Sequence, residues 1–206
     1  MRLVPRENFL WSKEQSVSAY EDEPIPLGNT GQTISAPHMI VTMLEELDLS
    51  RSQRVLEVGG GSGYNAALIA QIVGDGLEPS ECPVISIERD PALAQFARRN
   101  LESLRMEKMV CVVEGDGSLG YPQESNGERY DRIIVAAGAP HIPSFLKKQL
   151  KVGGILLVPV GFPGFQRLMK IRKESDETQP GKRRFKEESL MGCSFVPLIG
   201  SDAHYF

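Results

Sequence analysis

The sequence predicts an α/β fold in which a doubly wound, mostly parallel sheet ends in an antiparallel pair of strands at its C-terminal edge. Three observations support this prediction. A short apolar strand at 55–58 runs into a glycine-rich loop and then into an apolar helical segment at 64–73. Strand and helix patterns then alternate as far as residue 160, as in a parallel sheet with helices on both faces. Two further strand-like segments follow without a helix between them.

The length of 206 residues predicts a single domain with one full core. Within this domain we expect three parts. A covering segment occupies residues 1–35, the core occupies 36–160, and the edge strands occupy 161–206.

The composition argues against a polyanionic partner. Lys and Arg number 23 against 27 Asp and Glu, and the net charge of -4 attracts neither nucleic acid nor an anionic membrane. No apolar run is long enough to span a bilayer, and the N-terminus has no export pattern. Cys82, Cys111 and Cys193 are odd in number, far apart and without a C-x-x-C pair. We therefore expect neither a zinc site nor a disulfide framework, and a reducing cytoplasm as the location.

The beginning of the chain is predicted to cover the core without belonging to it. Residues 1–30 are rich in proline, glycine and acidic groups and should be extended. Apolar residues then recur at helical spacing, which predicts a helix at 36–49, with Pro37 in its first turn. Ser35 stands just before this helix. Because serine is among the preferred helix caps, the residues alone favour a capping role for it.

The glycine loop at 59–63 predicts a nucleotide-type cofactor site. Glycine lets the backbone approach a ligand and adopt positive φ. The dinucleotide fingerprint would need another glycine where this chain has Tyr64. The pattern G-x-G-x-G after Glu57 instead resembles the first motif of S-adenosylmethionine-dependent methyltransferases, so we expect 36–160 to be a cofactor-binding core of Rossmann-like fold. The alternative is a tight strand-to-helix turn that binds nothing.

Two acids are expected at the same edge of the sheet as this loop. The strand at 84–88 ends in Glu88, where a carboxylate of a doubly wound sheet can accept hydrogen bonds from both ribose hydroxyls. The strand at 109–113 leads to Asp116, between two glycines. The alternatives are a solvated acid for Glu88 and an Asx-turn for Asp116.

The remaining elements complete the sheet. We expect strands at 130–138 and 153–160 around a helix at 143–150, and then edge strands at 167–172 and 190–198. The charged stretch at 173–188 should join the edge strands as an exposed loop, because acidic neighbours surround its basic residues, which are Lys182, Arg183, Arg184 and Lys186. The three histidines have no metal-ligand spacing, so no metal is expected.

Taken together, the motifs resemble those of the protein-L-isoaspartate O-methyltransferase family. The stretch 31–39 (GQTISAPHM), upstream of 56–65 (LEVGGGSGYN), carries most of this resemblance. It continues through 133–140 (IIVAAGAP) and 195–200 (FVPLIG), and it extends over nearly the whole chain.

The resemblance implies roles for individual residues. Ser35 becomes the active-site serine, in preference to a plain cap. Contacts with S-adenosylmethionine are implied for Glu57, Gly59, Gly60, Gly61, Glu88, Asp116 and Gly117. An extended peptide should bind by its main chain along 24–34 and 195–198, and from these stretches we expect substrate contacts by Gln32, Thr33, Ile34 and Val196.

The implied activity is repair of damaged proteins, by methyl transfer to the free α-carboxylate of L-isoaspartyl residues. Such a carboxyl group has a reference pKa of about 3.3–3.7, so it is ionised at neutral pH and catalysis reduces to placement. Two alternatives remain, a small-molecule methyltransferase and a cofactor-binding regulator without turnover. We expect a monomer. Relatives usually carry a helix upstream of 4–9, so a partly open lid is also expected.

Overall fold

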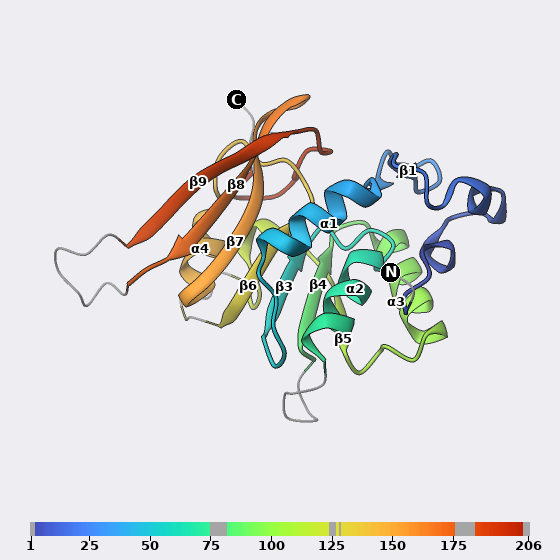
Figure 1. Cartoon of the computed structure of the whole chain (residues 1–206), viewed down its shortest axis with the longest axis horizontal. Helices are drawn as coiled ribbons and strands as arrows, with labels where there is room; N and C mark the ends of the chain where they lie inside the picture. Colours follow the sequence, from blue (N-terminus) through green and yellow to red (C-terminus); the bar gives the residue numbers. More distant parts are fainter. Residues whose placement is uncertain (1–2, 75–81, 124–126, 128, 176–183, 204–206) are drawn as a thin grey trace.

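The computed structural model describes residues 3–74, 82–123, 127, 129–175 and 184–203. It contains a seven-stranded sheet in the order β5-β4-β3-β6-β7-β8-β9 (Figure 1). The strands are β3 (Val55–Val58), β4 (Val84–Glu88), β5 (Val110–Glu114), β6 (Tyr130–Val135), β7 (Leu150–Phe162), β8 (Phe165–Lys173) and β9 (Phe185–Cys193). Neighbouring strands are parallel from β5 through β4, β3 and β6 to β7. The pairs β7-β8 and β8-β9 are antiparallel. The predicted fold class is confirmed.

Helices cover both faces of this sheet. The α-helices are α1 (Pro37–Glu46), α2 (Tyr64–Val73), α3 (Pro91–Ser103) and α4 (Ser144–Gln149). Helices α1, α2 and α3 pack on one face, against Val55, Val84 and Ile134, whereas α4 packs on the other. The alternation of Val55 with Leu56 shows how each strand supplies both cores, because successive side chains point to opposite faces.

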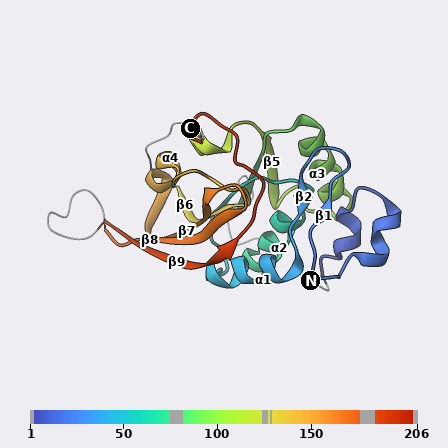
Figure 2. The same ribbon diagram turned by 90° about the horizontal axis from the view of Figure 1, so that it is seen from above.

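The covering segment, residues 1–35, contributes side chains to the hydrophobic core. It forms the 3-10 helices η1 (Arg6–Phe9) and η2 (Lys13–Ser18) and a two-stranded sheet of β1 (Ile25–Pro26) and β2 (Thr33–Ile34). Phe9 and Leu27 are fully buried in the core shared with α1 and α2. The expectation that this segment stays outside the core is therefore wrong. Seen from above, the segment and the residues after β9 lie on opposite sides of α1 and α2 (Figure 2).

The last edge strand differs from its prediction. Strand β9 ends at Cys193, whereas 190–198 was expected to be the strand. Charged residues occupy β9 because it is an exposed edge where Glu188 pairs across from Lys170, and opposite charges at facing positions are favourable. Residues 194–198 leave the sheet, and Val196 O accepts a hydrogen bond from Gly138 N. Within the expected 173–188 loop, Lys182 and Arg183 lie outside the described residues, while Lys186 belongs to β9.

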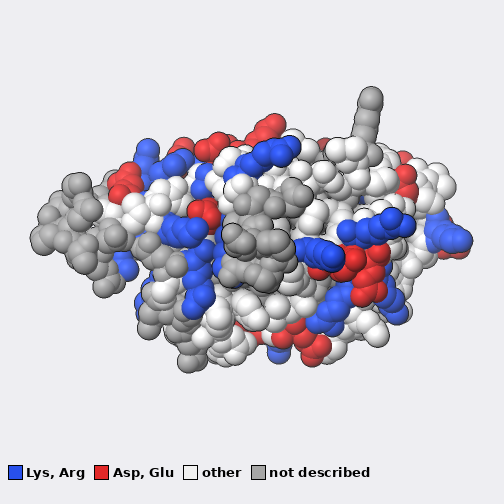
Figure 3. Space-filling view, turned by 90° about the horizontal axis from the view of Figure 1, so that it is seen from below, with Lys and Arg blue, Asp and Glu red and all other residues white. Residues whose placement is uncertain are grey.

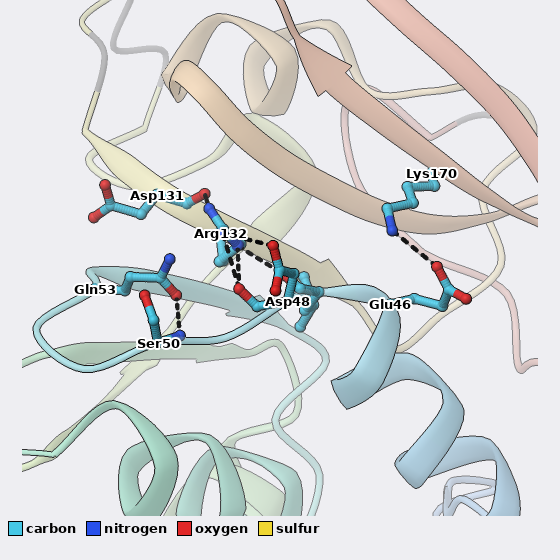
Figure 4. Close-up of polar contacts among 8 residues, drawn as sticks. Glu46, Asp48, Ser50, Gln53, Asp131, Arg132 and Lys170 are labelled. Carbon is cyan, nitrogen blue, oxygen red and sulfur yellow. Dashed lines mark hydrogen bonds and ion pairs between the residues drawn. The ribbon is translucent and has the colours of Figure 1, made fainter.

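Helix α1 is shorter than predicted and is anchored at its C-terminal end. It stops at Glu46, and Asp48 turns the chain with φ of 52°. The guanidinium of Arg132, on β6, donates to the carbonyls of Leu47 and Asp48, the latter at 2.9 Å (Figure 4). Lys170 on β8 forms an ion pair with Glu46 at 2.8 Å. The two bonds from Arg132 satisfy carbonyls that the end of a helix leaves without partners.

The cysteine prediction is wrong. Cys82, just before β4, forms a disulfide with Cys111 in β5, and only Cys193 among the described cysteines is free. The two strands are sheet neighbours, so a separation of 29 residues in sequence becomes a Cα–Cα distance of 5.8 Å.

Basic and acidic side chains are interspersed over the face shown in Figure 3. In the described part of the chain, no helix is both long enough and apolar enough to cross a membrane.

Candidate active site

A cavity of about 830 Å³ lies at the carboxyl ends of β3, β4 and β6. Ligands of doubly wound sheets bind at this edge, where the strand order reverses. The structure brings most of the predicted site residues together in its lining, which includes Gln32, Thr33, Ile34, Ser35, Gly59, Gly60, Gly61, Glu88, Gly117 and Val196. Glu57 and Asp116 do not line it.

The glycine loop forms a backbone cradle at one end of this cavity. Gly59 and Gly61 have φ of 90° and 53°, as the sequence predicted for a loop that needs positive φ. Both Gly59 N and Gly60 N donate to the carbonyl of Ile87, at 2.9 and 3.1 Å, which holds the loop against β4. A side chain at Gly60 would collide with Ser86. All three glycines line the cavity, so a ligand can approach the backbone of the loop closely.

Glu88 stands where the predicted ribose contact should be. It is 8% exposed and lines the cavity at the end of β4. One carboxylate oxygen accepts from Gly61 N at 2.8 Å and the other from Asp90 N at 2.9 Å. These backbone bonds orient the carboxylate beside the glycine cradle. A carboxylate and a glycine backbone facing one cavity fit the adenosine part of S-adenosylmethionine.

The Glu88→Ala variant should bind S-adenosylmethionine more weakly by roughly 1.5–3 kcal/mol, the range for hydrogen bonds to a charged group. Titration calorimetry measures the change. Glu114→Ala is the matched control, because Glu114 faces Glu88 in β5, is exposed and does not line the cavity. Equal affinities for both variants would contradict the assignment.

Glu57 supports the cradle from beneath. It is fully buried, and its carboxylate accepts hydrogen bonds from Asn65 Nδ2 at 2.7 Å and from the Ser86 hydroxyl. Burial raises the pKa of Glu57 to about 7, although the bonds from Ser86 and Asn65 oppose this rise. The side chain joins β3 to α2 and β4 and does not face the cavity.

Asp116 follows the alternative of a local turn. Its Oδ1 accepts from Ser118 N at 2.9 Å and its Oδ2 from Ser201 N at 2.6 Å. Partial burial would raise the pKa of Asp116, but these hydrogen bonds outweigh it and lower the pKa. The neighbouring Gly117 does line the cavity, and a side chain there would collide with Val58.

Ser35 is not a helix cap. The N-cap of α1 is Ala36, and the Ser35 side chain makes no capping hydrogen bond to this helix. Within the described part of the chain, the Ser35 hydroxyl makes no hydrogen bond to protein, and the half-buried residue lines the cavity. Its backbone carbonyl accepts a hydrogen bond from Arg6 at 2.9 Å. The hydroxyl is therefore left to meet a ligand.

Sequence reasoning missed several residues of the lining. His38 and Met39 contribute from α1, and Asn65 contributes from the start of α2. All three lie within the two quoted motifs, 31–39 and 56–65, so the motifs could have indicated them. Residues 191–193 also line the cavity, but no local signal marks them, because the sequence placed them inside a strand.

The fold and the site define a class of protein. A doubly wound sheet with a glycine cradle after β3 and an acid at the end of β4 is the architecture of a class I S-adenosylmethionine-dependent methyltransferase.

Comparisons with known proteins narrow this class. A profile of the protein-L-isoaspartate(D-aspartate) O-methyltransferase family matches residues 1–203. A protein-L-isoaspartate O-methyltransferase of Hyperthermus butylicus is 48% identical, over 97% of this chain and 79% of the relative. One of Pyrococcus horikoshii is 51% identical, over 88% and 75% respectively.

Two solved structures agree. A protein-L-isoaspartate O-methyltransferase has a TM-score of 0.82 at 30% identity; the match covers 97% of this chain and 60% of that one. A Plasmodium falciparum protein described as such an enzyme, in complex with S-adenosyl-L-homocysteine, has a TM-score of 0.80 at 26% identity, with 96% and 87% covered.

The chain belongs to the protein-L-isoaspartate O-methyltransferase family. It is an enzyme of this class, and its cofactor is S-adenosylmethionine.

Proposed function

We propose that Ser35 and Thr33 hold the free α-carboxylate of an L-isoaspartyl residue for methylation, so that the chain repairs damaged proteins and peptides. One observation carries this proposal. The Ser35 hydroxyl, which no protein group engages in the described chain, shares a cavity with the glycine cradle and Glu88. This arrangement supports an acceptor site and a cofactor site that share one cavity.

The chemistry asks little of the protein besides placement. S-adenosylmethionine supplies a methyl group that its sulfonium already activates. A carboxylate acceptor is ionised at neutral pH, so no base is needed to remove a proton. Ser35 can donate a hydrogen bond to one carboxylate oxygen, and Thr33 can do so from β2. Holding two reactants in line can lower the activation barrier by on the order of 7–11 kcal/mol. Contacts that only orient the carboxylate can therefore account for catalysis.

Backbone amides at the start of α1 contribute little to binding of the acceptor carboxylate. Pro37 has no N–H, and His38 N donates to the carboxylate of Asp22 at 2.9 Å. The task of binding the acceptor carboxylate therefore falls mainly on the two hydroxyls.

The substrate peptide is proposed to lie between two rigid stretches. Strand β2 is already paired with β1, through Ile25 and Ile34. On the opposite side, Phe195 exchanges two hydrogen bonds with the side chain of Gln166, and Val196 accepts from Gly138. Main-chain recognition of an extended segment between these stretches would tolerate many sequences.

We also propose a monomer and a cytoplasmic location. A single copy already brings Ser35, the glycine cradle and Glu88 to one cavity, which supports a monomer. Cys193 has no described cysteine left to pair with, so its free thiol does not identify the compartment. The Cys82–Cys111 bond removes the earlier argument that the chain lacks a disulfide.

The Ser35→Ala variant should methylate an isoaspartyl peptide roughly 10- to 100-fold more slowly, as expected for the loss of one hydrogen bond to a charged group. Affinity for S-adenosylmethionine should not change. The assay is release of a base-labile methyl ester, with the matching aspartyl peptide as the inert substrate. Ser103→Ala is a control, because the Ser103 hydroxyl donates to Asn100 O within α3 and the residue does not line the cavity. A parallel fall in cofactor affinity would overturn the assignment of Ser35 to the acceptor.

The same assay separates the proposed function from both alternatives. A small-molecule methyltransferase would leave both peptides unmodified, and a regulator without turnover would bind S-adenosylmethionine and release no ester. The curated relatives favour neither.

A further inference from the structure

Arg6 is a buried cation in the covering segment, and it has no part in the mechanism proposed above. It lies at the start of η1 and is fully buried. Its guanidinium lies 5.6 Å from the ring centroid of Tyr64, the residue that follows the glycine loop and lines the cavity. Burial lowers the pKa of Arg6. A buried arginine is ordinarily retained with a strong partner, because an uncompensated buried charge is costly.

The partners of this arginine are backbone carbonyls. Nη1 donates to Ser35 O at 2.9 Å and Nη2 to Glu23 O at 3.4 Å. Nε is buried and, among the described residues, has no hydrogen-bond partner. No ion pair of Arg6 with a carboxylate is found in the described part of the chain. The charge is therefore directed chiefly at the peptide group of Ser35.

That peptide group determines where the Ser35 hydroxyl points. Ser35 links β2 to Ala36 and Pro37, the cap and first residue of α1. The covering segment holds the same junction at a second point, because the carboxylate of Asp22 accepts from His38 N at 2.9 Å. Of the two contacts, the one from Arg6 falls on the acceptor-binding residue itself.

We propose that Arg6 is a positioning residue for methyl transfer, which fixes the Ser35 backbone so that its hydroxyl meets the acceptor carboxylate. This proposal rests on the proposed role of Ser35. Arg6 acts through Ser35, and it does not touch the acceptor. A misplacement of about 1 Å can reduce a rate by about 100-fold. Loss of the contact that holds Ser35 should therefore lower kcat while leaving the affinity for S-adenosylmethionine unchanged.

The test is a double-mutant cycle of Arg6→Met and Ser35→Ala, measured as kcat on an isoaspartyl peptide below the unfolding temperature of every variant. Arg6→Met alone should lower kcat by about 10- to 100-fold, with the dissociation constant of S-adenosylmethionine unchanged. In the Ser35→Ala background the same change should cause no further loss, because the residue through which it acts is already gone.

Two further variants complete the design. Arg6→Lys retains the charge in case Arg6→Met does not fold, and it should lower kcat in the same direction because an ammonium cannot span both carbonyls. Arg98→Met is the matched control, since Arg98 also donates to a carbonyl, Val112 O at 3.1 Å, but lies outside the cavity lining. It should leave kcat unchanged.

The outcomes are distinguishable. If Ser35→Ala is slow and the Arg6 effect multiplies with it, or if Arg6 variants change only the melting temperature, the positioning role is overturned and the role of Ser35 stands. If Ser35→Ala retains full turnover, both are overturned. If the wild-type chain forms no ester on the isoaspartyl peptide, the proposed function itself has failed.

Discussion

Replacing Glu57 by glutamine is expected to abolish a loss of stability between about pH 4.5 and pH 7. The pKa of Glu57 is raised from 4.5 to about 7 in the folded chain, so the folded state retains a proton that the unfolded state releases. The free energy of unfolding therefore falls as the pH rises through this window. A difference of this size corresponds to about 3 kcal/mol, as an order of magnitude.

Glutamine is the appropriate replacement because its geometry preserves both contacts. Its amide oxygen can accept from Asn65, and its amide nitrogen can donate to the Ser86 hydroxyl. Urea denaturation at pH 5 and pH 8 gives the measurement, with the exposed Glu114→Gln as control. The wild type should lose stability relative to Glu57→Gln between the two pH values. Curves that shift in parallel for both proteins would show that Glu57 is ionised throughout.

The second large effect is expected for Arg132→Met. The guanidinium of Arg132 satisfies the carbonyls of Leu47 and Asp48 at the end of α1, and the residue is only 8% exposed (Figure 4). Methionine would fill the space of the stem and leave these carbonyls without their donor. We expect the free energy of unfolding to fall by roughly 3–4 kcal/mol, from charge-assisted bonds worth about 1.5–3 kcal/mol each.

Lys170→Met provides the comparison for this experiment. Lys170 ties the same helix to the sheet through Glu46, but the Glu46 side chain is 36% exposed. Because solvent screens such pairs, its loss should lower the free energy of unfolding by less than about 1 kcal/mol. Equal losses in the two variants would mean that the backbone contacts of Arg132 add nothing to an ordinary ion pair.

Local sequence patterns were sufficient to predict the elements around the glycine loop. The strand at 55–58, the loop with positive φ and the helix at 64–73 are determined by residues adjacent in sequence, and all are as predicted. Pro91 likewise begins α3, with the side chain of Asp90 as its cap. Glu88 lines the cavity because it ends a parallel strand, and the carboxyl ends of the parallel strands form the ligand-binding edge of this fold.

The structure differs most from the predictions where distant segments meet. The position of β9 depends on charge pairing with β8, which the apolar pattern near Leu198 did not indicate. Glu57 and Asp116 lie beside glycines that line the cavity, but partners elsewhere in the chain turn their side chains away, namely Ser86 and Ser201. Arg6 reaches Ser35 across 29 residues, and no spacing rule predicts such a contact.

The Cys82–Cys111 disulfide reinforces the sheet at the end where no chemistry takes place. It joins the entrance of β4 to the early part of β5, and neither cysteine lines the cavity. A bond that closes a span of 29 residues restricts the unfolded chain and can stabilise the fold by about 3 kcal/mol. Its constraint acts at the amino ends of these strands, whereas Glu88 works at the carboxyl end. The covalent link therefore lies at one end of β4, and the cavity that must admit a damaged polypeptide lies at the other end.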